Sequence, residues 1–334
     1  MVSVFITVDT EVWPSVEGWP HRPLDERHDA ARAIDWYLWG GRGVQALGVP
    51  WQLDVLARHR LRATYFVDPM FSFALGLRPL RELVGRVVDA GQEVGLHLHP
   101  EWLTDPRCTG LPAFAGPLLH RYPEHEQAAL VAAGLARLAD AGAPRAAAFR
   151  AGSWGASRAT LRALRGHGIR CDSSLNARFR ASFPDLDDEA RERATQPFAI
   201  EGVREFPVTN FIDRPPRGRR PLHVCAASLG EFRAVLEHAA REDWEAVVIV
   251  LHSFEFVRVD RIGGAGDAKP QRTIATRFER LCAYLDAHRE RFATRHFADV
   301  ATPDEGAATH PPLPRSTHAR TALRHLQQLA SRFY

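Results

Sequence analysis

The sequence has few cysteines, and none of them is spaced as a pair. The four cysteines lie far apart and form no CxxC motif: Cys108, Cys171, Cys225 and Cys282. This pattern is typical of free thiols in a reducing compartment. We therefore expect a cytoplasmic protein without structural disulfides.

The chain also lacks a strong net charge and a long hydrophobic run. It has 43 basic and 40 acidic residues, for a net charge of +3, which gives no support to nucleic-acid binding. No apolar stretch approaches the roughly 20 residues that a membrane span needs, and no signal peptide precedes the first strand. We expect a soluble protein, and the oligomeric state stays open.

The first eleven residues are the most informative stretch. Residues 2–8 are β-branched or apolar and predict a buried parallel strand, which then ends in Asp9 and Glu11. Residues at positions i and i+2 of a strand point to the same side, so the two carboxylates can meet just beyond the strand. α/β folds place their ligands at this end of the sheet. The alternative is that either acid only caps the next element.

Segments of strand and helix alternate along most of the 334 residues. We expect strands at 62–68, 93–97, 146–150, 169–171, 204–208, 246–251 and 293–297, and helices at 49–56, 80–90, 124–141, 157–165, 229–241 and 273–288. The alternation implies parallel pairing, and seven or eight such units favour a closed or nearly closed α/β barrel in one large domain.

The composition changes near residue 302, where Pro, Ala, Gly and Thr become frequent. We place a linker there, followed by a short basic amphipathic helix at 321–334. The chain is thus divided into a barrel, 1–300, and an extension, 301–334. The helix is expected to dock on the barrel, with attachment to a partner or an acidic membrane surface as the alternative.

The third expected strand ends in two histidines, His97 and His99, followed by Glu101. The histidines are two residues apart, so both imidazoles point the same way, as Asp9 and Glu11 do. Two imidazoles and one carboxylate leave a coordination position for water, which is the hydrolytic arrangement of zinc. A water on such an ion still needs a base for its proton, and the second carboxylate could supply it.

Two later strand ends add candidate groups. Arg150 ends the fourth strand and could pair with the carboxylate that acts as general base, keeping that carboxylate ionised and oriented. His252 ends the most hydrophobic strand and could protonate a leaving group.

Five short motifs, in order, resemble the polysaccharide deacetylases, which are metal-dependent enzymes that remove acetyl groups from sugars. The motifs lie at 7–11, 93–100, 150–154, 172–174 and 251–252. The resemblance implies a distorted (β/α) barrel of seven or eight units with a short C-terminal helical extension. This sequence departs from the usual pattern in two places: Thr10 follows Asp9, and the histidines are two residues apart instead of four. Its His-x-His-Pro motif resembles a branch associated with bacterial cell-surface polysaccharide synthesis.

The resemblance also implies the roles of the residues. Asp9 is the expected base and His252 the expected acid, while Arg150 tunes Asp9. Glu11, His97 and His99 are the expected ligands of a divalent metal, for which zinc is the natural ion, and Glu101 is a reserve ligand. The expected substrate-binding residues are Trp13, Trp102, Trp154, Asp172 and Ser173.

The resulting hypothesis is a hydrolase that removes an N-acetyl group from an amino sugar, by attack of metal-bound water with Asp9 as base and His252 as acid. Flat tryptophan faces suit sugar rings, although most tryptophans only bury surface. Three alternatives stay open: a catalytically weakened saccharide-binding protein, a hydrolase of a non-sugar amide on the same fold, and a metal-dependent phosphoesterase. The last expects more histidines and acids at later strand ends.

Overall fold

The structure is a computed structural model of the whole chain. It describes residues 1–13, 29–41, 46–213, 218–258, 269–300 and 310–333. Residues 301–309 of the expected linker, and residues 14–28, which include Trp19, lie outside the described residues.

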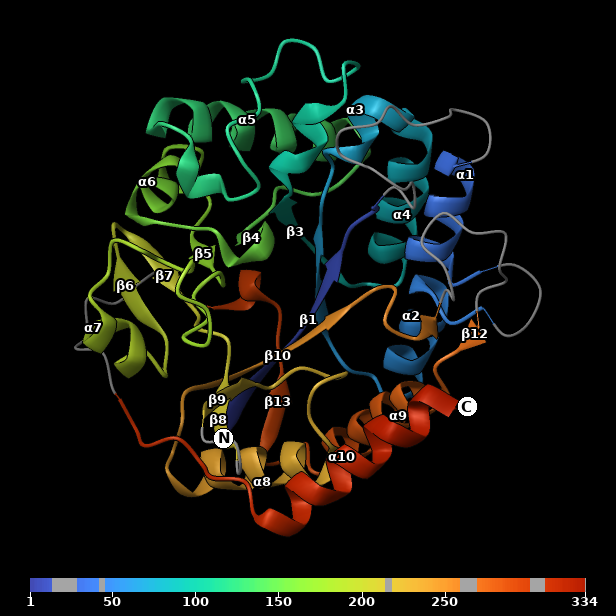
Figure 1. Cartoon of the computed structure of the whole chain (residues 1–334), viewed down its shortest axis with the longest axis vertical. Helices are drawn as coiled ribbons and strands as arrows, with labels where there is room; N and C mark the ends of the chain where they lie inside the picture. Colours follow the sequence, from blue (N-terminus) through green and yellow to red (C-terminus); the bar gives the residue numbers. More distant parts are fainter. Residues whose placement is uncertain (14–28, 42–45, 214–217, 259–268, 301–309, 334) are drawn as a thin grey trace.

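A mixed sheet of nine strands forms the centre of the molecule (Figure 1). Its strand order is β10-β1-β2-β3-β4-β5-β7-β6, and β13 pairs with the start of β1. All pairs are parallel except β6 with β7. The strands are β1 Val2–Thr10, β2 Ala63–Val67, β3 Glu93–Leu98, β4 Ala148–Ala151, β5 Cys171–Asp172, β6 Phe198–Ile200, β7 Val203–Glu205, β10 Ala246–His252 and β13 Phe292–Thr294.

Irregular backbone covers the opening between β10 and the β6–β7 edge. Val248 N–H donates to the side chain of Thr209, and Val250 exchanges backbone hydrogen bonds with Leu222 and Val224. A regular ladder does not continue there, so the sheet is a half-barrel that these contacts complete. The expected distorted (β/α) barrel is confirmed.

Helices surround the sheet (Figure 1). They are α1 Asp29–Ile34, which continues into a π-helix at Asp35–Trp39, α2 Val49–Arg58, α3 Phe71–Leu75, α4 Leu77–Asp89, α5 Glu124–Asp140, α6 Arg158–Gly166, α7 Asp188–Arg193, α8 Leu229–Arg241, α9 Arg272–Ala287 and α10 His318–Phe333. On α4, the buried residues are Leu80, Leu83, Val84 and Val87, which is the spacing of one helix face. At the start of α6, the side chain of Ser157 caps the helix by accepting a hydrogen bond from Thr160 N–H.

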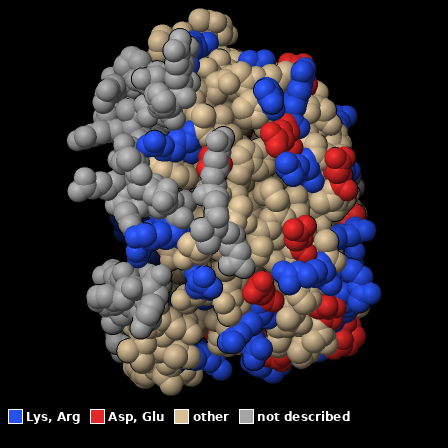
Figure 2. Space-filling model, turned by 90° about the vertical axis from the view of Figure 1, so that its right-hand side faces the viewer, with Lys and Arg blue, Asp and Glu red and all other residues tan. Residues whose placement is uncertain are grey.

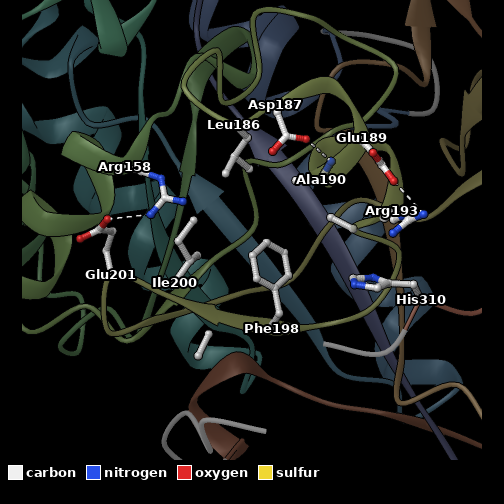
Figure 3. A pocket seen from close by; sticks show the side chains of 12 residues that line it. Arg158, Leu186, Asp187, Glu189, Ala190, Arg193, Phe198, Ile200, Glu201 and His310 are labelled. Carbon is white, nitrogen blue, oxygen red and sulfur yellow. Dashed lines mark hydrogen bonds and ion pairs between the residues drawn. The ribbon is translucent and has the colours of Figure 1, made fainter. Parts of the chain in front are cut away.

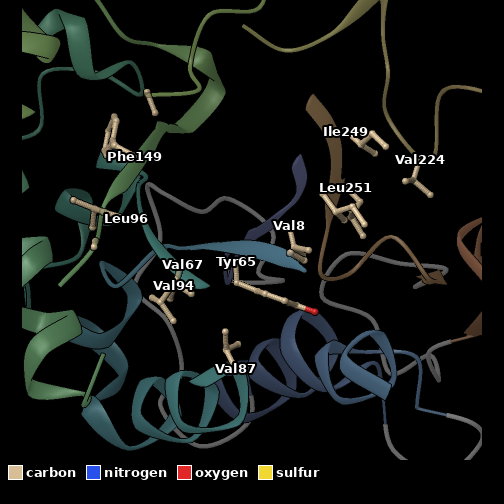
Figure 4. Close-up of a cluster of buried hydrophobic side chains, with 14 of the residues drawn as sticks. Val8, Tyr65, Val67, Val87, Val94, Leu96, Phe149, Val224, Ile249 and Leu251 are labelled. Atoms are coloured by element: carbon tan, nitrogen blue, oxygen red, sulfur yellow. The ribbon is translucent and has the colours of Figure 1, made fainter. Parts of the chain in front are cut away.

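Alternate residues of β1 serve two cores. Val4, Ile6 and Val8 pack in the larger core, which includes helix residues (Figure 4). Phe5 points the other way and contacts Phe206 and Phe297 inside the barrel, with ring centroids 5.0 and 4.6 Å apart. Period-two alternation then puts Thr7, Asp9 and Glu11 on the same side as Phe5. The barrel interior is thus filled by aromatic side chains around Phe5 and is polar at the carboxyl ends of the strands.

Several elements of the structure were not predicted from the sequence. Two hairpins, β8 Asn210–Asp213 with β9 Gly218–Pro221 and β11 Val257–Arg258 with β12 Lys269–Pro270, lie outside the main sheet. The fifth strand is only Cys171–Asp172, later than the expected 169–171. Short 3-10 helices occur at Pro100–Thr104, Leu119–Arg121, Gly152–Trp154 and Phe297–Asp299.

On the face that Figure 2 shows, basic and acidic side chains are interspersed, mainly along its right-hand side and bottom, and no large described area carries one charge only. This agrees with the nearly equal numbers of basic and acidic residues. Within the described part of the chain, no helix has both the length and the hydropathy needed to cross a bilayer.

Candidate active site

A small cavity of about 300 Å³ lies at the carboxyl ends of the parallel strands. Its lining residues are Asp9, Glu11, Trp13, His97, His99, Ala151, Ser153, Trp154 and His252. They come from β1, β3, β4, β10 and the segments that follow them. The structure therefore brings together the expected base, acid and metal ligands.

Strand register explains this convergence. Asp9 on β1 pairs with His252 on β10, and His97 on β3 pairs with Arg150 on β4. His252 Nε2 lies 4.0 Å from Asp9 Oδ2 and 3.9 Å from Glu11 Oε1. The expected base, Asp9, and the expected acid, His252, thus face the same cavity.

Glu11, His97 and His99 form a compact group of metal-type donors. One ligand atom from each lies within 4.8 Å of the others, and all three residues are buried. His97 Nε2 lies 3.3 Å from Glu11 Oε2, which His99 Nε2 also contacts. The second nitrogen of each ring is occupied: His97 Nδ1 donates to the Arg150 carbonyl at 2.7 Å and His99 Nδ1 donates to Glu101 at 3.2 Å.

This arrangement fits a divalent metal. Hydrogen bonds that hold one ring nitrogen leave the other, Nε2, directed at the centre of the group, which is how metal-binding histidines are oriented. Glu101 belongs to this outer set of contacts through His99. The fourth coordination position would face the cavity, as in hydrolytic zinc sites.

The charges of the three ligands are strongly interdependent. Burial alone would raise the pKa of Glu11, but the charge of His99 and hydrogen bonds from both histidines hold it well below its usual value. Burial would lower the pKa of His99, yet Glu11 and Glu101 raise it well above the usual value. Without an ion, a proton on His99 compensates the carboxylates, which is the charge that a metal would supply.

Arg150 is fully buried and bonded through all three of its nitrogens. Nη1 donates to Asp9 Oδ1 at 2.6 Å and to Thr7 Oγ1 at 2.8 Å, while Nε and Nη2 donate to the carbonyl and hydroxyl of Ser173. Its guanidinium lies 4.5 Å from the Phe66 ring centroid. Gly95 makes room for that ring, since a Cβ there would come within 2.6 Å of it. Asp9 is thus held in one orientation by a rigid partner.

Asp172 and Ser173 lie behind Arg150, fully buried, and are not among the residues that line the cavity. Asp172 accepts a hydrogen bond from Ser174 and bonds to the neighbouring carboxyl of Glu205, whose pKa is raised well above its usual value by burial and by Asp172. Ser173 binds Arg150 directly, and Asp172 lies on β5, which pairs with β4, the strand that carries Arg150. The two residues thus support Arg150 and do not face the cavity.

The tryptophans divide into two groups. Trp13 packs edge-on against His99, with centroids 4.6 Å apart, and Trp154 stacks with the exposed Phe179 at 6.4 Å. Both line the cavity. Trp102 is 1% exposed and packs in the hydrophobic core instead. Ser153 and Trp154 have φ of 51° and 61°, an uncommon conformation for non-glycine residues that clusters at functional sites.

Two acids beside the site, Glu255 and Asp68, had no expected role. Glu255 accepts a hydrogen bond from His252 Nδ1 at 2.8 Å. Burial would lower the pKa of His252, but this bond and the charge of Glu255 raise it to about 9. Asp68, at the end of β2, has its pKa raised to about 7 by burial, opposed by His99 and His97. Asp68 could have been found by the signal that marked Asp9, an acid directly after a buried strand.

A larger cavity, of about 740 Å³, lies near α7 and β6 (Figure 3). Phe198, Leu186 and Ile200 contribute apolar surface, and the charged residues around it are paired, Arg158 with Glu201 and Arg193 with Glu189. It holds no cluster of metal-type donors among the described residues. Chemistry, not size, therefore identifies the smaller cavity as the candidate active site.

Comparison with known proteins places the fold. No protein-family model and no curated protein sequence matches the chain. A Mycobacterium smegmatis protein classed as a polysaccharide deacetylase has a similar structure, with a TM-score of 0.55, 16% identity, and coverage of 93% of this chain and 95% of that one. The 4-alpha-glucanotransferase of Thermococcus litoralis gives 0.51 at 12% identity, covering 91% of this chain but 41% of that enzyme. A family 4 carbohydrate esterase from Streptomyces lividans gives 0.40 at 12% identity, covering 91% and 97%.

The similarity to the Mycobacterium smegmatis protein defines the class of fold. The chain has a polysaccharide-deacetylase-like fold, so the expected resemblance is confirmed at the level of architecture.

Proposed function

We propose that this protein is a metal-dependent hydrolase that removes an N-acetyl group from an amino sugar. The observation that carries the proposal is the convergence of Asp9, Glu11, His97, His99 and His252 on one cavity at the carboxyl end of the barrel. The fold, which is that of carbohydrate deacetylases, supports a hydrolase of this kind.

The roles of the residues follow from their contacts. Glu11, His97 and His99 would hold the ion, for which zinc suits two imidazoles and a carboxylate. When bound, the ion would supply Lewis acidity to the acyl carbonyl and lower the pKa of a water. Asp9, fixed by Arg150, would take the proton of the attacking water.

His252 would complete the reaction as the general acid. Its raised pKa keeps it protonated at neutral pH, so it can give a proton to the departing amine. Trp13 and Trp154 would supply flat apolar surface for the sugar ring. The small volume of the cavity, about 300 Å³, suits an acetyl group and part of one sugar better than a long acyl chain.

The test measures metal content and acetate release together. Protein reconstituted with zinc is incubated with an N-acetylated amino-sugar oligosaccharide, and acetate and free amine are quantified. Release that requires zinc and is lost in Glu11→Gln supports the proposal. Bound zinc and saccharide without acetate release would instead support a saccharide-binding protein, and release from a non-sugar amide alone would change the substrate class.

A further inference from the structure

A second cluster of metal-type donors lies beside the catalytic cavity. It consists of His223 and Cys225, from the segment between β9 and α8, and Glu255, from the turn after β10. One ligand atom from each lies within 4.8 Å of the others. The cluster shares no residue with Glu11, His97 and His99.

The hydrogen bonds determine where the protons are. Glu255 Oε1 accepts from His252 Nδ1 at 2.8 Å and lies 3.1 Å from His223 Nε2, so the hydrogen of a neutral His223 ring belongs on Nε2. Burial lowers the pKa of His223, which favours the neutral ring. Its Nδ1 lone pair then faces Cys225 Sγ, 2.8 Å away. A ring nitrogen held by a carboxylate, with the other nitrogen free to bind, is the arrangement of a metal-binding histidine.

Glu255 has binding capacity that the described residues do not use. Its side chain is 9% exposed, and its second oxygen, Oε2, is buried and accepts no well-directed hydrogen bond from the described residues, although the Cys225 thiol lies beside this carboxyl. A buried carboxylate oxygen in this state costs free energy and calls for a partner. Because Oε1 already serves two imidazoles, a ligand at Oε2 would not disturb the bond to His252.

We propose that His223 Nδ1, Cys225 Sγ and Glu255 Oε2 form a second binding site, for a divalent ion of the zinc type. The thiol proton leaves to solvent as the ion binds, and Cys225 turns so that the ion takes the place of that proton. One thiolate, one carboxylate and a neutral imidazole balance the two positive charges. Cys225 is partly exposed, which gives the ion a route and leaves a coordination position for solvent.

The metal-free state of this site keeps its thiol. Burial and Glu255 raise the pKa of Cys225, so the thiolate forms only when a cation stabilises it. The bound ion would connect the 222–227 segment to the turn that follows His252. Its expected effect is to stabilise the part of the barrel that no regular strand pairing closes.

Sulfur distinguishes this site from the first one, whose donors are nitrogen and oxygen. Metal-free protein is titrated with Co²⁺, and thiolate-to-cobalt charge transfer is followed in the near ultraviolet. We expect two equivalents of cobalt per chain and a charge-transfer band from one of them. Cys225→Ser should lose the band and retain one equivalent, while Cys108→Ser, which alters another partly exposed cysteine, should keep both.

A Glu11→Gln variant separates this inference from the proposed reaction. It should keep the charge-transfer band even where acetate release is lost. A second measurement uses the wild-type protein: zinc should protect Cys225, but not Cys108, from alkylation mapped by mass spectrometry. A wild-type protein that binds one equivalent without a band, a band that survives Cys225→Ser, or equal alkylation of both cysteines would overturn the inference.

Discussion

Two arginines of this protein are fully buried against an aspartate, and they do different things. Arg150 bonds to Asp9 at the candidate active site, and Arg324 on α10 bonds to both oxygens of Asp213 on β8, at 2.8 and 2.9 Å. Both guanidinium groups are 0% exposed. The ion pair alone therefore does not mark the site.

The two aspartates differ in how many of their carboxylate oxygens are bonded within the protein. Asp213 uses both oxygens inside the protein, because Thr321 and Arg220 also donate to them. Asp9 Oδ1 accepts a hydrogen bond from Arg150, whereas its Oδ2 faces His252 in the cavity. A saturated pair attaches the C-terminal helix, whereas a pair with one oxygen at a cavity can accept a proton. The variants below test this comparison.

The largest effect is expected for Asp9→Asn. The amide keeps the shape of the side chain but cannot take a proton, so turnover should fall by about 10²–10⁴-fold. Metal content should stay near the wild-type value, whereas stability should fall because the buried Arg150 loses its counter-charge, so turnover is measured per folded, metal-loaded protein. Asp54→Asn, at an exposed position of α2, is the control and should leave turnover, metal content and stability at wild-type values. Retained acetate release by Asp9→Asn would remove Asp9 from the role of base.

Arg324→Met should show the opposite pattern. It removes the buried cation that Asp213 and Glu231 share and leaves Asp213 with the partly exposed Arg220, and breaking such a buried pair costs on the order of 3 kcal/mol of unfolding free energy. Denaturant unfolding measures this loss, and kcat of the folded fraction should be unchanged. Arg193→Met, which breaks an exposed pair with Glu189, should cost at most about 1 kcal/mol. A fall in kcat without loss of stability would contradict the comparison.

Glu101→Gln tests a contact outside the group of ligands. Loss of the charge that holds His99 Nδ1 should weaken zinc binding at the first site by about 10–100-fold, as measured by competition with a chelator. Asp105→Asn provides a matched control, since Asp105 is a nearby buried acid that bonds to Arg107. Unaltered zinc affinity in Glu101→Gln would leave Glu101 with a packing role only.

Glu255→Gln should move the alkaline side of the pH profile. In the proposed reaction the protonated form of His252 is the active one, so kcat/KM should fall as pH rises through about 9, the raised pKa of His252. Without the negative charge, that pKa drops and the fall should begin about 1 pH unit lower. Protein carrying one equivalent of zinc is used for both profiles. Coincident alkaline limbs would show that Glu255 does not set the protonation of His252.

Much of the fold could be predicted because its signals are local. The hydrophobic runs of β1 and β10, and the helix-type spacing of α4 and α8, depend on near neighbours in the sequence. The strand order could not be predicted, since it depends on pairing between distant segments. The β8–β9 hairpin is local, but its strands, NFID and GRRP, lack the alternation of apolar and polar residues that predicts a strand. The irregular closure through Thr209, Leu222 and Val224 likewise has no periodic signal.

The site was predictable where chemistry follows a strand. Asp9, His97 and His252 end apolar runs, and parallel strands bring such ends together. The positions of Trp102 and Asp172 were not predictable, because the motif does not reveal whether a side chain faces the cavity or the core. His223 and Cys225 follow an irregular segment with no strand pattern, so only the three-dimensional structure places them beside Glu255.

The pairing of β1 with β10 also determines when, during synthesis, the two halves of the proposed site are present together. The residues proposed to hold the first metal come from the early part of the chain, on or just after β1 and β3. The proposed proton donor, His252, arrives only with β10, after most of the barrel has left the ribosome. A growing chain could therefore hold an ion, and gain folding stability from it, well before it can process a substrate.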